Sequence, residues 1–159
     1  MTLTLSSTDF APGEMIPVRF TCEGADQSPA LTWGGMPDGT ASFALIMDDP
    51  DAPRGPFTHW LLYNLSSHVR GLPQGVEKVD ALSDSARQGM NDFKRVGYGG
   101  PCPPVGHGPH RYYFTLYALD TMLDLPPRAS KSDLLQAMDG HILGQAQIMG
   151  RFERKQQRG

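Results

Sequence analysis

Residues 111–119 read Arg111-Tyr112-Tyr113-Phe114-Thr115-Leu116-Tyr117-Ala118-Leu119 and predict a β-strand more strongly than any other part of the chain. Aromatic side chains favour strands, and this run has the period of two that a strand requires. Two further runs, residues 42–47 and 58–65, are almost entirely apolar. Such runs are typical of central strands that are covered on both faces. Together the three runs predict a mostly β protein.

Weaker patterns complete this prediction. Residues 16–21 and 31–33 are expected to form shorter strands, and the first contains a proline suited to a sheet edge. One short helix is expected after Ser130, a plausible N-cap, with Asp133 in its first turn and Gly140 as its stop. Residues 141–152 fit either a second helix or a returning strand. Residues 70–109 show no long element, and irregular stretches of this length are often functional.

Length and composition exclude several classes of protein. The 159 residues fit one domain spanning 1–159, and 18 glycines with 14 prolines exclude a long-helix protein or coiled coil. A net charge of −3 offers no excess of cations for a nucleic-acid backbone. The basic tail, residues 151–158, is expected to be a solvated, partly frayed terminus.

The cellular location of the protein and the redox state of its cysteines are predicted from features that the chain lacks. The chain contains no run of 18 apolar residues, so no transmembrane helix is expected. Its first residues lack the basic start and the apolar run of a signal peptide. We therefore expect a cytoplasmic protein. Its two cysteines, Cys22 and Cys102, are too few for a disulfide scaffold. We expect them to be reduced thiols, although the sequence leaves open whether they meet.

Two clusters of polar residues follow the predicted central strands. The first is Asp48-Asp49-Pro50-Asp51-Ala52-Pro53, with His59 shortly after it. An Asx-type turn ending a strand is the simpler explanation of these carboxylates. Two prolines in one tight turn also favour a cis Ala52–Pro53 bond.

The second cluster is His107, His110, Arg111 and Tyr112, which follow a loop rich in glycine and proline. A solvated polar surface is its simpler explanation. If the central strands are neighbours, however, His59, His110, Tyr112 and Asp49 converge at one end of the sheet. We then expect Asp49 to accept hydrogen bonds from an imidazole or from loop N–H groups. Such a pocket suits a phosphate or carboxylate, with an affinity that falls as the imidazoles lose their protons.

Other chemistries find less support. The chain has neither the G-x-S-x-G motif of α/β-hydrolases nor a Walker A motif. Cys102, His107 and His110 lack a fourth ligand and a standard zinc spacing, so we expect no metal. A hydrolase that acts on a phosphoester, with His59 and His110 as acid and base, stays open as the alternative to a binding protein.

Two regions of the chain resemble the signature motifs of the phosphatidylethanolamine-binding protein family, which includes the Raf kinase inhibitor protein. They are Asp49-Pro50-Asp51-Ala52-Pro53 with His59-Trp60, and Gly100-Pro101-Cys102-Pro103-Pro104 with His110-Arg111-Tyr112. Two further features resemble the bacterial branch of that family. They are residues 20–33, which contain Phe20-Thr21-Cys22-Glu23-Gly24, and the cysteine within the Gly-Pro-Cys-Pro-Pro run.

The resemblance implies a β-sandwich with a large central antiparallel sheet, a smaller second sheet and one or two short peripheral helices. It implies a non-enzymatic pocket, without cofactor or metal, for phosphate-like anions, carboxylates or phosphorylated headgroups. A protein partner such as a kinase, and a homodimer, are left open. By position, the pocket residues would be Asp49, Asp51, His59, Gly100, Cys102, Pro103, Pro104, His110 and Tyr112.

Overall fold

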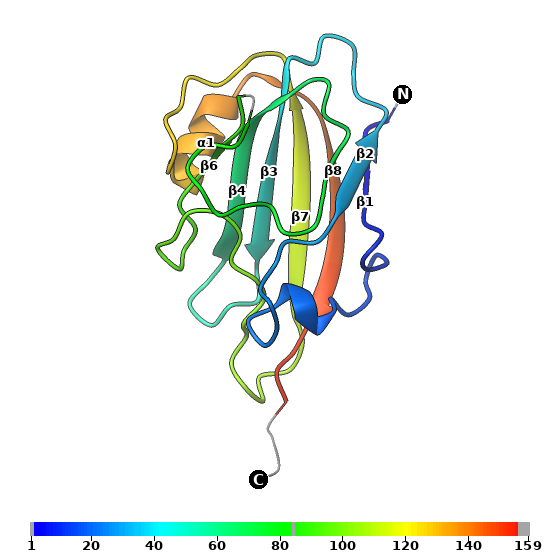
Figure 1. The fold of residues 1–159 in the computed structure, drawn as a ribbon, viewed down its shortest axis with the longest axis vertical. Helices are drawn as coiled ribbons and strands as arrows, with labels where there is room; N and C mark the ends of the chain where they lie inside the picture. Colours follow the sequence, from blue (N-terminus) through cyan, green and yellow to red (C-terminus); the bar gives the residue numbers. More distant parts are fainter. Residues whose placement is uncertain (1, 84, 156–159) are drawn as a thin grey trace.

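The computed structural model describes residues 2–83 and 85–155, which form two antiparallel sheets (Figure 1). The larger sheet has the order β6-β4-β3-β7-β8. Its strands are β3 (Ser42–Asp49), β4 (Phe57–Ser66), β6 (Arg87–Gln88), β7 (His110–Leu119) and β8 (Ile142–Phe152). The smaller sheet, β1-β2-β5, is built from β1 (Thr4–Ser6), β2 (Leu31–Gly34) and β5 (Gly71–Leu72). The expected mostly β architecture, with a large and a small sheet, is confirmed.

Both faces of the larger sheet are covered, by different layers. One face packs against the smaller sheet and the N-terminal segment, through a core that includes Trp33, Phe43, Trp60 and Phe114. The other face packs against helix α1 (Lys131–Met138) and the segment before it. This arrangement explains why β3 and β4 are apolar along most of their length, since neither of their faces meets water.

The three strongest strand predictions are confirmed, and the strands are neighbours. β3 pairs with β4 along one edge and with β7 along the other, both antiparallel. Residues 141–152, which fitted either a helix or a strand, contain β8, the strand next to β7. The described part of residues 70–109 contains no strand longer than two residues, as expected from its composition.

The predicted helix begins where its cap signals place it. The Ser130 hydroxyl accepts a hydrogen bond from the Asp133 N–H, and the Asp133 carboxylate accepts one from the Ser130 N–H, which completes a capping box. Gly140 has a φ of 82°, a left-handed conformation that suits a residue just past a helix end. None of the described helices is both long and apolar enough to cross a membrane.

Two local predictions are wrong. Residues 16–21 do not form a strand but contain a short 3₁₀ helix, η1 (Val18–Phe20), because Phe20 and Thr21 donate their N–H groups to carbonyls three residues back. The tail is not frayed from residue 151 onward. Arg151 belongs to β8, and the Phe152 side chain, only 4% exposed, packs in the core. Residues 156–158 of that tail lie outside the described part of the chain.

The turn after β3 also differs from expectation. The described residues contain no cis peptide bond, so the predicted cis Ala52–Pro53 bond is wrong. The turn closes instead through hydrogen bonds from Asp51 N–H to the Asp49 carboxylate and from Gly55 N–H to the Ala52 carbonyl. These bonds reverse the chain with every peptide bond trans.

The cysteines are not reduced thiols, because the fold joins Cys22 to Cys102 in a disulfide. The turn after η1 lies against the loop that precedes β7, where the Cys22 N–H donates to the Pro101 carbonyl. This contact brings the two Cα atoms to 5.4 Å, within the range that a disulfide requires. The sequence gives no sign of the pairing because the two residues are 80 positions apart.

Replacing both cysteines, as Cys22→Ser with Cys102→Ser, is expected to lower the free energy of unfolding by about 2–4 kcal/mol. The cross-link closes a long loop and so restricts the unfolded chain. Guanidinium unfolding measures the change, and wild-type protein in excess reductant is the control that should match the variant. Equal midpoints for the oxidised wild type and the variant would contradict a bond between these residues.

Candidate functional site

His59 lies at a β-bulge in β4, and this irregularity decides which face of the sheet it occupies. Its neighbours Thr58 and Trp60 pair with consecutive residues of β3, so His59 has no residue opposite it. In a regular strand His59 would point away from the face that Trp60 occupies. A bulge re-aims the extra side chain. His59 therefore packs against Tyr112 on the side of the smaller sheet, with the two ring centroids 5.2 Å apart.

Asp49 and His110 form a buried pair at the same end of the sheet. Asp49 closes β3, His110 opens β7, and the His110 Nδ1 donates to the Asp49 carboxylate at 2.7 Å. Both side chains are almost fully buried. The other Asp49 oxygen accepts the Asp51 N–H. The expectation that Asp49 accepts hydrogen bonds from an imidazole and from a loop N–H is confirmed.

Tyr112 contributes a buried hydroxyl to this corner. Its side chain follows His110 on the same face of β7 and is fully buried. Among the described residues, no group meets the distance and angles of a hydrogen bond with the Tyr112 hydroxyl, although the Asp49 carboxylate lies close enough to act on it. Burial, together with the nearby negative charge of Asp49, raises the pKa of Tyr112 well above its usual range. The phenol therefore stays protonated and can donate a hydrogen bond.

These side chains surround one small cavity of about 200 Å³. Of the predicted site residues, seven line it: Asp49, His59, Cys102, Pro103, Pro104, His110 and Tyr112. The predicted convergence of two imidazoles, a phenol and an acid is thus observed, whereas their binding of a ligand remains a prediction. Sequence reasoning missed Phe57 and Phe93, which also line the cavity and pack on each other. Of the two, only Phe57 could have been inferred from the sequence as a lining residue, because it lies two residues before His59.

Asp51 and Gly100 belong to the predicted set but do not line the cavity. Asp51 pairs with Arg111 through two side-chain hydrogen bonds, which lower the pKa of Asp51 to about 2. Gly100 lies behind the cavity wall, and its N–H donates to the Asp26 carboxylate. A Cβ at Gly100 would come within 2.4 Å of the Phe20 carbonyl oxygen, so no other residue fits there. Neither residue lines this cavity, although Gly100 lines a second cavity beside it.

His107 extends the Asp49–His110 pair toward the surface. Its Nδ1 lies 2.6 Å from the His110 Nε2, and the His107 side chain itself is exposed. Cys102, His107 and His110, the zinc candidates of the sequence, do not form a metal site, because the Cys102 sulfur is bonded to Cys22. Within residues 2–83 and 85–155, no group of three His, Cys, Asp or Glu side chains has the geometry to hold a metal ion.

The His59 imidazole is held in one tautomer. Its Nδ1 lies 2.6 Å from the Gly99 carbonyl oxygen, which can only accept, so Nδ1 carries the proton. Burial lowers the pKa of His59, while the Gly99 carbonyl and the Asp49 and Asp48 carboxylates partly oppose that shift. At neutral pH His59 is therefore uncharged, and its Nε2 has no proton to donate.

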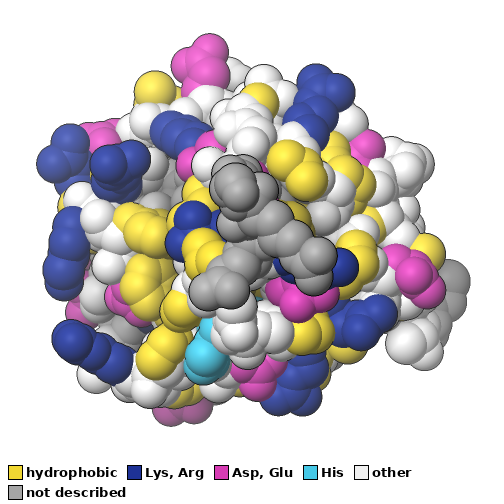
Figure 2. All heavy atoms as spheres, turned by 90° about the horizontal axis from the view of Figure 1, so that it is seen from below, with side chains coloured by type: hydrophobic (Ala, Val, Ile, Leu, Met, Phe, Trp, Pro, Cys, Tyr) yellow, Lys and Arg dark blue, Asp and Glu magenta, His cyan; other side chains and the backbone are white. Residues whose placement is uncertain are grey.

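Arg154 supplies a positive charge that the sequence analysis assigned to a solvated tail. It is half-buried, its Nε donates to the Pro103 carbonyl, and its charge acts on the Tyr112 hydroxyl. Figure 2 views this end of the molecule, where Lys and Arg side chains gather along the left edge and a His side chain reaches the surface. Arg154 thus places a positive charge beside the cavity although the chain as a whole is acidic.

Known proteins are similar to this chain in sequence and in fold. A UPF0098 protein of Aquifex aeolicus is 53% identical over 149 residues, covering 93% of this chain and 86% of the relative. A UPF0098 protein of Methanothermobacter thermautotrophicus is 48% identical over 152 residues, covering 96% of this chain and 99% of the relative.

Two solved structures are similar along nearly their whole length. Escherichia coli YbcL, described as a new member of the mammalian PEBP family, has a TM-score of 0.89 at 34% identity, covering 96% of this chain and 99% of that chain. A PEBP homologue, CT736 of Chlamydia trachomatis, has a TM-score of 0.88 at 39% identity, covering 96% and 98%. The family model described as phosphatidylethanolamine-binding protein matches residues 6–153. The chain therefore belongs to the phosphatidylethanolamine-binding protein family, in agreement with the resemblance of its motifs.

Proposed function

We propose that the protein binds a small oxyanion, such as a phosphate, a carboxylate or a phosphorylated headgroup, in the cavity between His59 and His110. The observation that carries this proposal is the buried Tyr112 hydroxyl, which lines the cavity without a hydrogen-bond partner among the described residues. A buried donor of this kind costs free energy unless something accepts its hydrogen bond, and an anion does so strongly.

The charges around the cavity favour an anion once His59 takes up a proton. The Asp49 carboxylate would repel an anion, but its two oxygens are already engaged by His110 and by the Asp51 N–H. A protonated His59 would add a charged Nε2–H donor, and the charge of Arg154 acts from the rim. The apolar Phe57 and Phe93 rings strengthen such interactions because they keep water away.

A phosphoester hydrolase remains the alternative, and the Asp49–His110 pair is the observation in its favour. A carboxylate that orients an imidazole is a common arrangement for general acid–base catalysis. The described lining offers no Ser or Thr, and Cys102 is held in a disulfide, so the nucleophile would be a water molecule or a His or Asp side chain of the lining. Turnover of p-nitrophenyl phosphate that disappears in His59→Ala would support the hydrolase over the binding protein.

Three wider expectations stay predictions. Modulation of a partner such as a kinase, and a homodimer, rest on the family resemblance alone. The cytoplasmic location is predicted from sequence signals. The Cys22–Cys102 disulfide is relevant to that prediction, because such bonds persist mainly in oxidising compartments or in thermophiles. Mass spectrometry of alkylated protein from native cells would show whether the bond exists there.

Sulfate affinity is expected to fall as pH rises, by about tenfold per pH unit, in the window between the pKa of His59 in the free protein and its higher pKa with sulfate bound. The free His59 titrates below 6.5 because burial lowers its pKa, and a bound anion raises that pKa. Between the two values binding takes up a proton, so the affinity declines toward neutral pH and above. Sulfate is the probe because its own charge does not change in this range. Calorimetry in buffers of different ionisation enthalpy measures both the affinity and the proton uptake.

His59→Phe is expected to remove this pH dependence together with most of the sulfate affinity. His141→Gln is the control, because it removes an imidazole that lies on the surface, hydrogen-bonded to Asp120 and outside the cavity lining. If sulfate bound the wild type with the same affinity throughout the window and without proton uptake, the charged-imidazole mechanism would be wrong.

Tyr112→Phe is expected to weaken sulfate binding yet leave the unliganded protein as stable as the wild type, or more stable. Removing a buried hydroxyl that lacks a partner relieves a desolvation penalty of about 1–3 kcal/mol. Tyr63→Phe is the control, because the Tyr63 hydroxyl donates to the Pro126 carbonyl and accepts from the Ala129 N–H. That variant should lose about 1 kcal/mol or more of stability in denaturant unfolding. Equal losses in the two variants would contradict the unpartnered state of Tyr112.

A further inference from the structure

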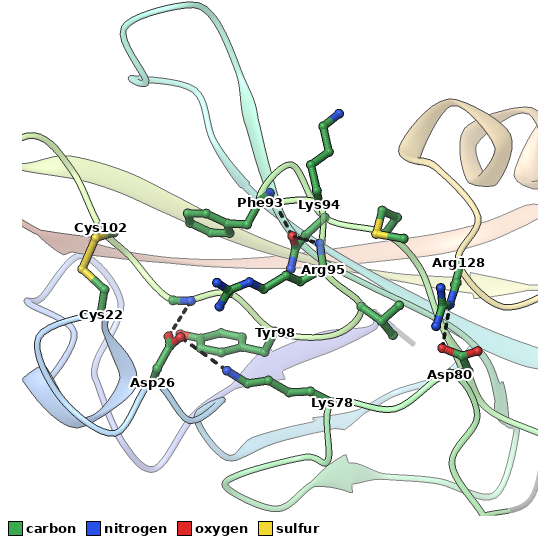
Figure 3. Close-up of a pocket in the computed structure, with 15 residues that line it drawn as sticks. Cys22, Asp26, Lys78, Asp80, Phe93, Lys94, Arg95, Tyr98, Cys102 and Arg128 are labelled. Atoms are coloured by element: carbon green, nitrogen blue, oxygen red, sulfur yellow. Dashed lines mark hydrogen bonds and ion pairs between the residues drawn. A yellow bond between two sulfur atoms is a disulfide. The ribbon is translucent and has the colours of Figure 1, made fainter.

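A second, larger cavity of about 590 Å³ adjoins the site and shares two residues with it, Phe93 and Cys102 (Figure 3). Its floor includes Tyr98, whose hydroxyl donates to the Phe20 carbonyl. The disulfide lies at one end and the Arg128–Asp80 pair at the other. The two cavities are therefore neighbouring compartments, separated by one aromatic ring and one cross-linked loop.

The dividing wall is held rigidly on both sides. The Gly99 carbonyl accepts from His59 Nδ1, and the Gly99 N–H donates to the His59 carbonyl. A Cβ at Gly99 would come within 2.5 Å of the Phe93 ring, so the loop and the ring are in close contact. A ligand bound in one cavity therefore lies next to the other cavity, with a wall of fixed position between them.

The larger cavity has a surplus of positive charge. Four of its side chains are cationic and two are carboxylates: Lys78, Lys94, Arg95 and Arg128 against Asp26 and Asp80. Both carboxylates are already paired, Asp26 with Lys78 and Asp80 with Arg128. Among the described residues, the side chains of Lys94 and Arg95 make no ion pair or hydrogen bond. Two charges are therefore left for an external anion.

The loop that carries these two cations is built around one buried side chain. The Asn91 carboxamide oxygen accepts the N–H groups of Phe93 and Arg95, and its nitrogen donates to the Gly97 carbonyl. Lys94 has a φ of 65°, in the left-handed region that a residue with a side chain seldom adopts. Asn91 thus fixes a tight turn whose Phe93 lines both compartments. In Figure 3 the Arg95 side chain reaches over Tyr98 into the larger compartment, whereas the Lys94 side chain extends outward from its rim.

From this arrangement we infer that the protein takes a ligand with two phosphate-type groups, one in the cavity at His59 and the second against Arg95, with the Lys94 charge at the rim of the larger cavity. This inference rests on the proposed function and extends it from a single oxyanion to a bisphosphorylated molecule. The second contact is intramolecular once the first has formed, so it adds affinity through a high effective concentration. Phosphate groups suit the site because a guanidinium binds their oxygens in pairs.

Calorimetry with inorganic phosphate and with short α,ω-alkanediol bisphosphates of increasing chain length tests the inference at constant ionic strength. At least one bisphosphate is expected to bind the wild type about tenfold or more tightly than inorganic phosphate does. The variant Lys94→Gln with Arg95→Gln should lose that advantage while it binds inorganic phosphate as the wild type does. Arg70→Gln with Lys155→Gln removes two charges outside both cavities and should keep it.

The outcomes separate this inference from the function on which it rests. If inorganic phosphate fails to bind the wild type, the oxyanion site itself is wrong. If phosphate binds but no bisphosphate gains affinity, or if the gain survives in Lys94→Gln with Arg95→Gln, the second contact is wrong. A gain that survives in His59→Phe would also overturn it, because the ligand would then not span the two compartments.

Discussion

The pairing of β3 with β4 on one edge and β7 on the other is the constraint on which the site depends. Because both neighbours run antiparallel to β3, the residue that closes β3 lies beside the residues that open the other two strands. Asp49 and His110 meet for this reason although 61 positions separate them. A slip of one residue between β3 and β7 would turn His110 and Tyr112 to the opposite face and separate them from Asp49.

The irregular segment between β6 and β7 is fixed by contacts with the rest of the molecule. It is tied to η1 and the turn after it by the disulfide to Cys22, by the Tyr98 hydroxyl, which donates to the Phe20 carbonyl, and by the Gly100 N–H, which donates to Asp26. The same segment forms the wall shared by the two cavities. Contacts that stabilise this loop therefore also shape both compartments, which is the usual way that a scaffold positions a functional loop.

The site retains groups that work against stability. His59 is buried and kept neutral, and the Tyr112 hydroxyl is buried without a described partner. Similar groups elsewhere in the fold are satisfied, as with Tyr63 and Tyr98, whose hydroxyls both reach backbone carbonyls. Unsatisfied and desolvated polar groups concentrated in one cavity are typical of binding and catalytic sites.

Much of this could be predicted from the sequence. Alternation and apolar runs identify the three central strands, the capping signals of Ser130 and Asp133 identify the helix, and the polar clusters identify Asp49, His59, His110 and Tyr112. These features depend on neighbouring residues, so a single sequence contains them. Phe93, Arg154 and the partner of Cys102 could not be predicted, because they reach the site from distant segments.

The three central strands, the helix and the types of residue at their ends follow from local sequence patterns, because backbone sterics and side-chain periodicity act over a few positions. The face on which His59 lies depends instead on how the strands pair. Strict alternation along β4 would turn His59 away from Tyr112, and the bulge that reverses it exists only because β3 pairs with Thr58 and Trp60 while leaving His59 unpaired. The same holds for the disulfide, since two cysteines can bond only after distant loops have been packed together.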